Sequence, residues 1–499
     1  MQICIVGGGT AGWLAALFLA KGKIKCSVTV IESSQIGIIG AGEGSTGMLT
    51  AVVKNDIWPF GCDLDDFIRE TKAGLKYGIE HINWSGDGES YFGPLGGSPT
   101  VFNYPDGAFH AQNLSDDPTH LISNYGYCKE NNILLIEDDD SYALHFDAHK
   151  VGNYFKNLVL KEDNCSCIDA KVLDVTLNEK GYIDRLFLDN NQYINADFFI
   201  DASGFNRILM NKLGVKYKSY TDNLPVNTAL PFLLDYDENT KPVPYTTAHA
   251  LSSGWMWGIP TQERKGCGYV FDSNFITVDE AHDEIERTLG HEVDPIRILK
   301  FETGRLEKLW CKNCLAIGLG AAFAEPLEAT SIHSTIVQLN AFAFEFLTND
   351  IESTCNKANI NQYNKRMTKM YDDFKDFLVM HYQTGRNDSE FWRYISSGAT
   401  RTDFVSHILE LCKIRSPNYN DFDTYFGSAS WPLYCWILAG IGAIDKNLSK
   451  VEVTYQLPSG ESFLDIMNAS RNNYFREKRI SGMTQPTYDY WIQSVSNIS

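Results

Sequence analysis

The chain has no run of about 18 consecutive apolar residues, so no membrane span is expected. Basic residues are also scarce. The 43 Lys and Arg residues against 63 Asp and Glu residues leave a formal charge of −20, which would repel nucleic-acid phosphates and anionic membranes. The N-terminus lacks the basic region that opens a signal peptide. We therefore expect a soluble cytoplasmic protein that binds neither nucleic acid nor membranes.

The twelve cysteines follow no framework of fixed spacings. Cys311 and Cys314 form a Cys-x-x-Cys pair, but no second pair or His partner follows at zinc-finger spacing. Free thiols in a reducing compartment and no metal site are the expectation. Repeats and low-complexity segments are missing too. With 499 residues, 44% of them apolar, the chain is typical of two or three globular domains or one large elaborated α/β unit.

What is present begins with a dinucleotide-binding fingerprint. Residues 2–6 predict a short buried strand that runs into Gly-x-Gly-x-x-Gly at 7–12, and residues 13–21 predict a helix. A second strand is predicted at 27–31. It ends in Glu32, 20 residues beyond the last glycine, where a carboxylate can accept hydrogen bonds from a ribose.

Each glycine of the fingerprint has its own task. Gly7 permits the tight turn, Gly9 lets the backbone approach a pyrophosphate, and Gly12 lets the helix pack closely on the strand. The start of the helix, at Thr10 and Ala11, offers free N–H groups and the positive end of the helix dipole to the phosphates. The fingerprint alone does not separate NAD from FAD.

Two later segments favour a cofactor held across several strand ends of one parallel sheet. Residues 196–204 are an apolar strand that ends in a small-residue turn, and residues 310–320 are another, with Gly318 near its end. Only one fingerprint is present, so no separate NAD(P)H domain is expected.

The remaining pattern is mixed. Residues 171–178 and 182–188 predict a hairpin, and Asp147 predicts an N-cap for a helix over 148–160. From residue 332 onward the pattern is mainly helical, including 340–347, 361–381 and an apolar, buried stretch at 430–443.

The most informative string is Trp-x-Trp-x-Ile-Pro, formed by Trp255, Trp257, Ile259 and Pro260. Taken alone it is compatible with a packed strand edge, because aromatic residues favour strands and Pro ends them. Other short motifs accompany it: 7–13, 40–44, Lys76 ahead of 82–84, 145–149, 201–205, 323–330, 391–392 and 438–440. In order and spacing, these motifs resemble the flavin-dependent halogenase family of the tryptophan-halogenase type across most of the chain. Within the family, the chain most resembles lean, phage-encoded members, which would place it in a host cytoplasm.

The resemblance implies that reduced FAD, O2 and a halide give hypohalous acid, which travels through a tunnel to a lysine beside the substrate. Trp255 and Trp257 match the family tryptophans that keep the organic substrate away from the flavin. Lys76 matches the lysine. It could act as a neutral amine that forms a haloamine or as an ammonium that polarises the acid, and the sequence does not choose between them.

The resemblance also implies a second group of site residues. Glu328 matches the glutamate that stabilises the cationic intermediate or accepts its proton, whereas Glu325 is expected to be structural. The backbone amides at Thr330 and Ser331 match the halide site. Gly42 and Glu43, in the motif at 40–44, are also expected to bind the cofactor. Reduced flavin is expected from a separate flavin reductase.

Two departures affect specificity. Ser331 stands where the family usually has Gly, which leaves the preference among chloride, bromide and iodide open. The tandem tyrosines that enclose free tryptophan in the family are missing around Gly427-Ser428 and Leu433-Tyr434. A phenol, aniline or indole other than free tryptophan is therefore the expected small-molecule substrate, and the oligomeric state stays open.

Three other functions remain as alternatives. An FAD-dependent aromatic monooxygenase would make product without halide, and a non-catalytic FAD-binding protein would make none. An iron-dependent enzyme is suggested only by the spacing of His145 and Asp147.

The predicted fold is a Rossmann-like FAD-binding α/β fold of the PHBH/GR2 type with an inserted substrate region and a mainly helical C-terminal part. Its expected limits are 1–84, 141–220 and 301–335 for the FAD-binding parts, 85–140 and 221–300 for the substrate region, and 336–499 for the helical region.

Overall fold

The computed structural model describes residues 1–37, 42–95, 107–115, 134–135, 142–237, 240–425, 427, 429, 431–456, 462–480, 484–485 and 488–496. Gly40 and Ala41, much of the predicted insert 85–140, and Ser428 lie outside the described residues. The chain forms two compact units. The first, called the nucleotide unit below, comprises Met1–Ala73, Phe146–Thr221 and Glu302–Asp373. The second, called the lysine unit because it contains Lys76, comprises Gly74–His145, Asp222–Phe301 and Phe374–Ser499.

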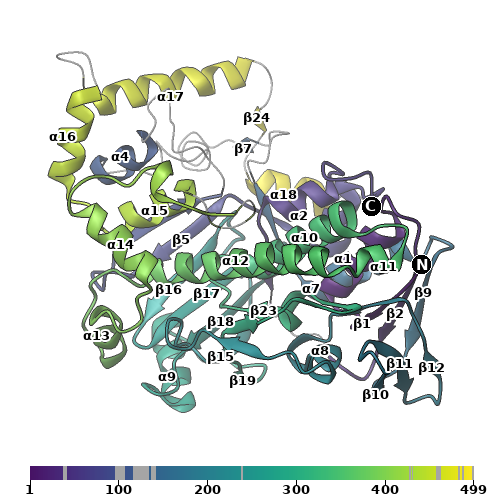
Figure 1. The fold of residues 1–499 in the computed structure, drawn as a ribbon. Coiled ribbons are helices and arrows are strands. Elements are labelled where there is room, and N and C mark those ends of the chain that lie inside the picture. Colours follow the sequence, from purple (N-terminus) through teal and green to yellow (C-terminus); the bar gives the residue numbers. More distant parts are fainter. Residues whose placement is uncertain are drawn as a thin grey trace. The chain divides into compact units, whose positions relative to one another are not determined.

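A six-stranded sheet organises the nucleotide unit (Figure 1). Five of its strands are parallel neighbours, and the fingerprint strand is the fourth in the order. The order is β21 (Trp310–Cys311), β22 (Cys314–Ala316), β13 (Phe198–Asp201), β1 (Gln2–Val6), β2 (Ser27–Glu32) and β9 (Cys165–Asp169). The predicted return of two later segments to the fingerprint sheet is confirmed.

The apolar segment at 310–320 is not a single strand. It folds into an antiparallel hairpin of β21 and β22, in which Lys312 adopts a left-handed conformation with φ of 55°. A 3-10 turn, η2 (Gly318–Gly320), follows. The strand prediction was therefore wrong in detail, because apolar composition does not reveal a two-residue turn.

Helices and small sheets complete the nucleotide unit. Helix α1 (Thr10–Ala20) is almost entirely buried, and α7 (Ala148–Val159) begins at Asp147, whose carboxylate accepts the N–H of His149 at 2.9 Å, as predicted. The predicted hairpin is also present, as β10 (Val172–Leu177) and β11 (Ile183–Leu188). The other elements are β3 (Glu43–Gly44), α2 (Gly47–Val53), α3 (Leu64–Thr71), β12 (Tyr193–Ile194), η1 (Gly204–Asn206), α8 (Ile208–Lys212), β14 (Tyr217–Ser219), β20 (Gly304–Leu306), β23 (Ala322–Phe323), α10 (Thr330–Ala341), the π-helix η3 (Phe342–Phe346) and α11 (Ile351–Thr354).

A seven-stranded sheet organises the lysine unit. Its order is β19 (Leu299–Lys300), β15 (Thr228–Asp235), β18 (Arg264–Phe271), β17 (Gly254–Pro260), β16 (Thr246–Leu251), β5 (Gly78–Ile82) and β6 (Ser90–Pro94). The tryptophan string lies in β17, which pairs with β16 and β18 along its length. It is thus a central strand, and the strand-edge interpretation of this string is wrong.

One face of this sheet is covered by α9 (Val278–Leu289). Met256, Tyr269 and Phe271 form a buried core with Ala281 and Ile285 of that helix. Because side chains alternate along a strand, Trp255 and Trp257 project from the opposite face to Met256.

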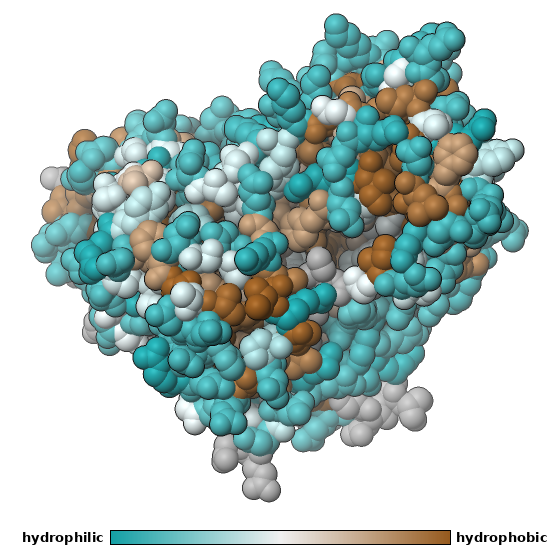
Figure 2. All heavy atoms as spheres, turned by 90° about the horizontal axis from the view of Figure 1, so that it is seen from below, coloured by the Kyte–Doolittle hydropathy of each residue, from teal (hydrophilic) through white to brown (hydrophobic). Residues whose placement is uncertain are grey.

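The chain after residue 336 is mainly helical, as predicted. Helix α12 (Lys357–His381) contains the boundary between the two units. The lysine unit also contains β4 (Gly74–Lys76), α4 (Gly107–Leu114), β7 (Leu134–Leu135), β8 (Ala143–Phe146, whose last residue belongs to the nucleotide unit), α13 (Glu390–Ser396), α14 (Asp403–Cys412), η4 (Tyr419–Asp421), α15 (Trp431–Gly440), α16 (Lys446–Gln456), α17 (Phe463–Ile480), β24 (Thr484–Gln485) and α18 (Tyr488–Ser496). Among the described residues, every helix is too short or too polar to cross a bilayer. Figure 2 shows a face on which hydrophilic side chains separate smaller groups of apolar ones.

Candidate functional site

The turn between β1 and α1 has the geometry of a phosphate cradle. Gly7 has φ of 119°, and a side-chain carbon there would lie 2.2 Å from the carbonyl oxygen of Ala202. A side-chain carbon at Gly12 would lie 1.9 Å from the carbonyl oxygen of Gly7. At Gly9, by contrast, an added carbon meets no atom of the described residues within 4 Å, and none of their side chains caps α1. The N–H groups at the start of the helix are thus open to an anion, and these residues fit the pyrophosphate of FAD.

Glu32 lies at the end of β2 and is held by two neighbours. The indole N–H of Trp13 donates to its carboxylate at 3.1 Å, and the ammonium of Lys156 donates to the other oxygen. A carboxylate can accept about four hydrogen bonds, so this arrangement leaves room for a ribose. The sequence did not identify Trp13 or Lys156 as partners, because the spacing of Lys156 carries no signal of the contact.

The other predicted cofactor residues are in the same unit. Gly318 opens η2 with φ of 58°, and a side-chain carbon there would lie 2.8 Å from the side chain of Ala11, so it approaches the fingerprint helix closely. Gly42 also adopts a left-handed conformation, with φ of 87°. Burial, together with the nearby carboxylate of Asp147, raises the pKa of Glu43 to about 7.

Glu328 lies in the loop between β23 and α10, half-buried, one residue before the helix cap. Ala329, at the cap, has a left-handed φ of 53°. Thr330 and Ser331 are the first residues of α10, where main-chain N–H groups have no partner within the helix. Glu325 is only 2% exposed, whereas Glu328 is the more accessible carboxylate.

Within the lysine unit, Lys76 is 1% exposed. It lies in β4, which pairs antiparallel with β8 in the register Lys76 to Ala143 and Gly74 to His145. Opposite residues of an antiparallel pair project from the same face, so Lys76 and His145 share one face of the two strands.

Burial and also the charge of Lys76 lower the pKa of two histidines, His145 and His81. Burial, and then the charge of Lys76, holds the pKa of His145 well below its usual range. The pKa of His81 is also held well below its usual range, first by burial, then by His381 and also by the charge of Lys76. Both rings are therefore neutral near pH 7, and the lysine lies in a desolvated part of the unit.

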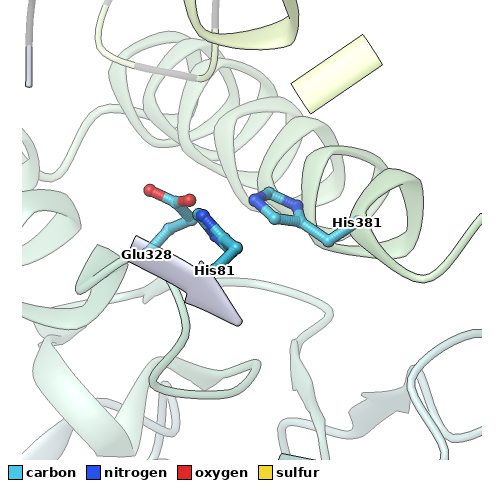
Figure 3. Close-up of side chains that lie close together, drawn as sticks. All are labelled: His81, Glu328 and His381. Atoms are coloured by element: carbon cyan, nitrogen blue, oxygen red, sulfur yellow. The ribbon is translucent and has the colours of Figure 1, made fainter. Parts of the chain in front are cut away.

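His81 belongs to a group of rings that sequence reasoning missed. Figure 3 shows the imidazoles of His81, from β5, and His381, from the last turn of α12, turned toward one another. Their ring centroids are 5.3 Å apart. Tyr91 stacks on His81 at 4.5 Å with an interplanar angle of 5°, and Trp84 lies edge-on at 5.8 Å. The buried positions of a strand are predictable from alternation, but the contact with a helix 300 residues later in the chain is not.

The indoles of Trp255 and Trp257 form a packed pair, called the tryptophan wall below. Trp255 is 1% exposed and Trp257 is 9% exposed, with ring centroids 6.3 Å apart. The ring of Trp257 covers Gly268, where a side-chain carbon would lie 2.2 Å from the indole. Ile259 is buried on the same side of β17, and Pro260 ends the strand. Tight packing fixes the orientation of both indoles.

The residue pair considered for iron is engaged in other contacts. The Nε2 atom of His145 lies 2.8 Å from the hydroxyl of Thr246, and Asp147 caps α7. These contacts occupy one possible ligand atom of each residue, Nε2 of His145 and Oδ1 of Asp147.

Comparison with known proteins identifies the family. Residues 2–455 match the tryptophan halogenase family. The tryptophan 7-halogenase RebH of Lentzea aerocolonigenes is 29% identical over 484 residues, which cover 89% of this chain and 90% of that protein. The 7-chloro-L-tryptophan 6-halogenase KtzR of Kutzneria sp. (strain 744) is 30% identical over 487 residues, with 88% and 90% covered. Among solved structures, the tryptophan C-6 flavin-dependent halogenase Tar14 from taromycin biosynthesis is 26% identical, with a TM-score of 0.84 and 99% of each chain covered. This chain therefore belongs to the tryptophan halogenase family and is an FAD-dependent halogenase.

Proposed function

We propose that the enzyme uses FADH2, O2 and a halide to form hypohalous acid, which Lys76 directs to an electron-rich aromatic substrate. When bound, reduced FAD supplies the electrons that reduce O2, and halide oxidation follows from that chemistry. The protein residues then have three tasks: to hold the cofactor, to keep the substrate away from it and to deliver the electrophilic halogen.

The burial of Lys76 is the observation that carries this proposal. Full burial is rare for lysine, because its ammonium loses hydration. Here it is 1% exposed and lies near the neutral rings of His81 and His145. A site of this kind favours either a neutral amine that accepts the halogen or an ammonium that donates a strong hydrogen bond to the acid.

The tryptophan wall supports the separation of the two reactions. Trp255 and Trp257 are large, tightly packed and fixed by a central strand, with Ile259 and Pro260 continuing the same strand. A barrier of this kind can exclude an aromatic ring and still admit a molecule as small as hypohalous acid. In this proposal the wall prevents direct oxygen transfer to the organic substrate.

Glu328 is the proposed base. Attack of the aromatic ring forms a carbon–halogen bond and breaks the bond from the halogen to the oxygen of the acid, or to the Lys76 nitrogen in a haloamine. The electron pair leaves with that oxygen or nitrogen, which takes up a proton to become water or the free amine, and the ring is left cationic. Loss of the ring proton to the Glu328 carboxylate then restores aromaticity. The main-chain N–H groups at Thr330 and Ser331 are the proposed halide ligands, since oriented N–H dipoles at a helix start attract anions.

The substrate we propose is a phenol, an aniline or an indole other than free tryptophan. Curated relatives are named for tryptophan, but this chain lacks the tandem tyrosines of that pocket. Tyr434 is 1% exposed, and its ring packs against Phe377 at 5.0 Å and Phe422 at 4.9 Å. These contacts commit Tyr434 to an aromatic core.

The test combines substrate screening with Lys76→Ala. Wild-type protein receives photoreduced FAD, O2, each halide in turn and a panel of phenols, anilines, indoles and free tryptophan, with products identified by mass spectrometry. Halogenated product is expected with the wild type. In Lys76→Ala, product should fall at least 100-fold, while flavin reoxidation continues and free hypohalous acid reaches a chemical trap.

Lys161→Ala is the control, because Lys161 is exposed at the end of α7. Equal product yields from Lys76→Ala and the wild type would reject the role of Lys76. Oxygenated product in the absence of halide would instead identify a monooxygenase.

A further inference from the structure

The strand that carries Lys76 is short and lies at the edge of its sheet. β4 has three residues, and among the residues that the structure describes it pairs with β8 alone. Its other edge would leave the N–H of Leu75 without a strand partner, and an unpaired buried N–H is costly. That N–H donates to the hydroxyl oxygen of Tyr488 at 3.1 Å.

The main chain of the residue after Lys76 is also held by a hydrogen bond. The N–H of Tyr77 donates to the carbonyl oxygen of Pro244 at 2.8 Å. Both residues that flank Lys76 are therefore fixed by hydrogen bonds from the main chain to groups outside β4 and β8. One of these two anchors is a side chain, so a single substitution can remove it.

Tyr488 begins α18 and is held in place. Its ring stacks on Trp491, one turn later, with centroids 5.5 Å apart and an interplanar angle of 12°. Ahead of it, Thr484 and Gln485 in β24 pair with Leu135 and Leu134 in β7. The segment that carries Tyr488 is thus paired with β7 on its N-terminal side.

The tyrosine hydroxyl also lies where two functional strands meet. A side-chain carbon at Gly74 would lie 2.9 Å from this hydroxyl and 3.1 Å from the carbonyl oxygen of Pro260. Gly74 begins the strand of Lys76, and Pro260 ends the strand of the tryptophan wall. Burial raises the pKa of Tyr488, so the hydroxyl stays protonated and uncharged at this junction.

We propose that Tyr488 is a positioning residue for Lys76, acting through its hydrogen bond to the main chain of Leu75. The inference rests on the proposed relay function of Lys76. Tyr488 lies beyond residues 2–455, the part of the chain that matches the family, so the anchor is assigned from this structure. Without it, β4 keeps its pairing with β8, but the backbone beside Lys76 becomes mobile and halogen transfer loses efficiency.

The first test needs no cofactor. Tyr488→Phe removes one oxygen and keeps the ring stacked on Trp491. Hydrogen–deuterium exchange of the FAD-free protein should show the Leu75 amide exchanging about tenfold faster than in the wild type, as expected for one lost hydrogen bond. Tyr490→Phe, on the same helix and 56% exposed, is the matched control and should leave this amide unchanged.

The second test measures coupling, the halogenated product formed per FADH2 reoxidised, for the wild type, Tyr488→Phe, Tyr490→Phe and Lys76→Ala. Coupling should fall about tenfold in Tyr488→Phe, with flavin reoxidation unchanged and more hypohalous acid trapped. If product and flavin reoxidation fall together at constant coupling, Tyr488 is merely structural and the inference is overturned. The inference is also overturned if Tyr488→Phe keeps the coupling of the wild type while Lys76→Ala loses product. Retained product in Lys76→Ala would show that the relay function itself is wrong.

Discussion

Lys72 and Lys76 are four residues apart and lie in opposite surroundings. Lys72 is half-buried at the end of α3, with a left-handed φ of 54°, whereas Lys76 is 1% exposed in β4. Both residues have the same chemistry in solution. Only the fold removes water from one of them, and this difference makes Lys76 the candidate for chemistry.

Glu328→Gln tests the proposed base. The amide keeps the size of the side chain but cannot accept the ring proton, so we expect halogenation to slow by about 100-fold or more. Flavin reoxidation and hypohalous acid formation should continue. Product formation followed by mass spectrometry provides the measurement, with the exposed Glu307→Gln as control. Near-normal turnover in Glu328→Gln would remove this residue from the site.

Glu43 gives a pH prediction. Its pKa is raised from 4.5 to about 7, mainly by burial and secondly by Asp147. Between these values the folded state holds a proton that the unfolded state has released, so the contribution of Glu43 to stability is greatest below about pH 4.5 and is lost as the pH rises through 7. Glu43→Gln cannot ionise and should gain roughly 2 to 3 kcal/mol relative to the wild type between about pH 5 and pH 8.

Thermal unfolding of the FAD-free proteins across this pH range measures the effect. Glu179→Gln, an exposed glutamate in the β10–β11 turn, is the control. Parallel stability curves for Glu43→Gln and the wild type would contradict the prediction.

At the scale of elements, the β1–α1 turn contains glycines of two kinds: some are needed for close packing, and one leaves space for a ligand. A side chain at Gly12 collides with the carbonyl of Gly7, whereas one at Gly9 meets none of the described atoms within 4 Å. Gly9→Val should therefore fold with an unchanged Tm but lose at least 100-fold in FAD affinity, because the valine occupies the space of the phosphates.

Flavin fluorescence titration measures this affinity. Gly37→Val is the control, because an added carbon at Gly37 also meets no atom within 4 Å in the part of the chain that the structure describes. Tight FAD retention in Gly9→Val would contradict the fingerprint interpretation.

Local patterns predicted the elements that depend on neighbours in sequence. The strand at 2–6, the hairpin of β10 and β11 and the cap at Asp147 all appear as expected. The turn that splits 310–320 was missed, because it depends on a left-handed Lys312, a conformation that lysine rarely adopts. The central position of β17 was missed as well, since a strand does not encode its neighbours in the sheet.

At the scale of the whole molecule, the chain has one dinucleotide fingerprint. We therefore propose that reduced flavin comes from a separate reductase. NADH or NADPH alone should leave bound FAD oxidised, and product should appear only when a flavin reductase or photoreduced FAD is added. Absorbance near 450 nm follows the flavin. Bleaching by NAD(P)H in the purified protein alone would contradict this prediction.

The sequence by itself determined the cofactor fold and the family, because a phosphate-binding turn and short ordered motifs are local arrangements of residue types. It also supplied Lys76 and Glu328 as candidates through resemblance. Tertiary structure alone decided the burial of Lys76, the neutral rings of His81 and His145 and the anchor from Tyr488. Desolvation and contacts between distant segments arise only when the chain packs, so no local pattern of residues specifies them.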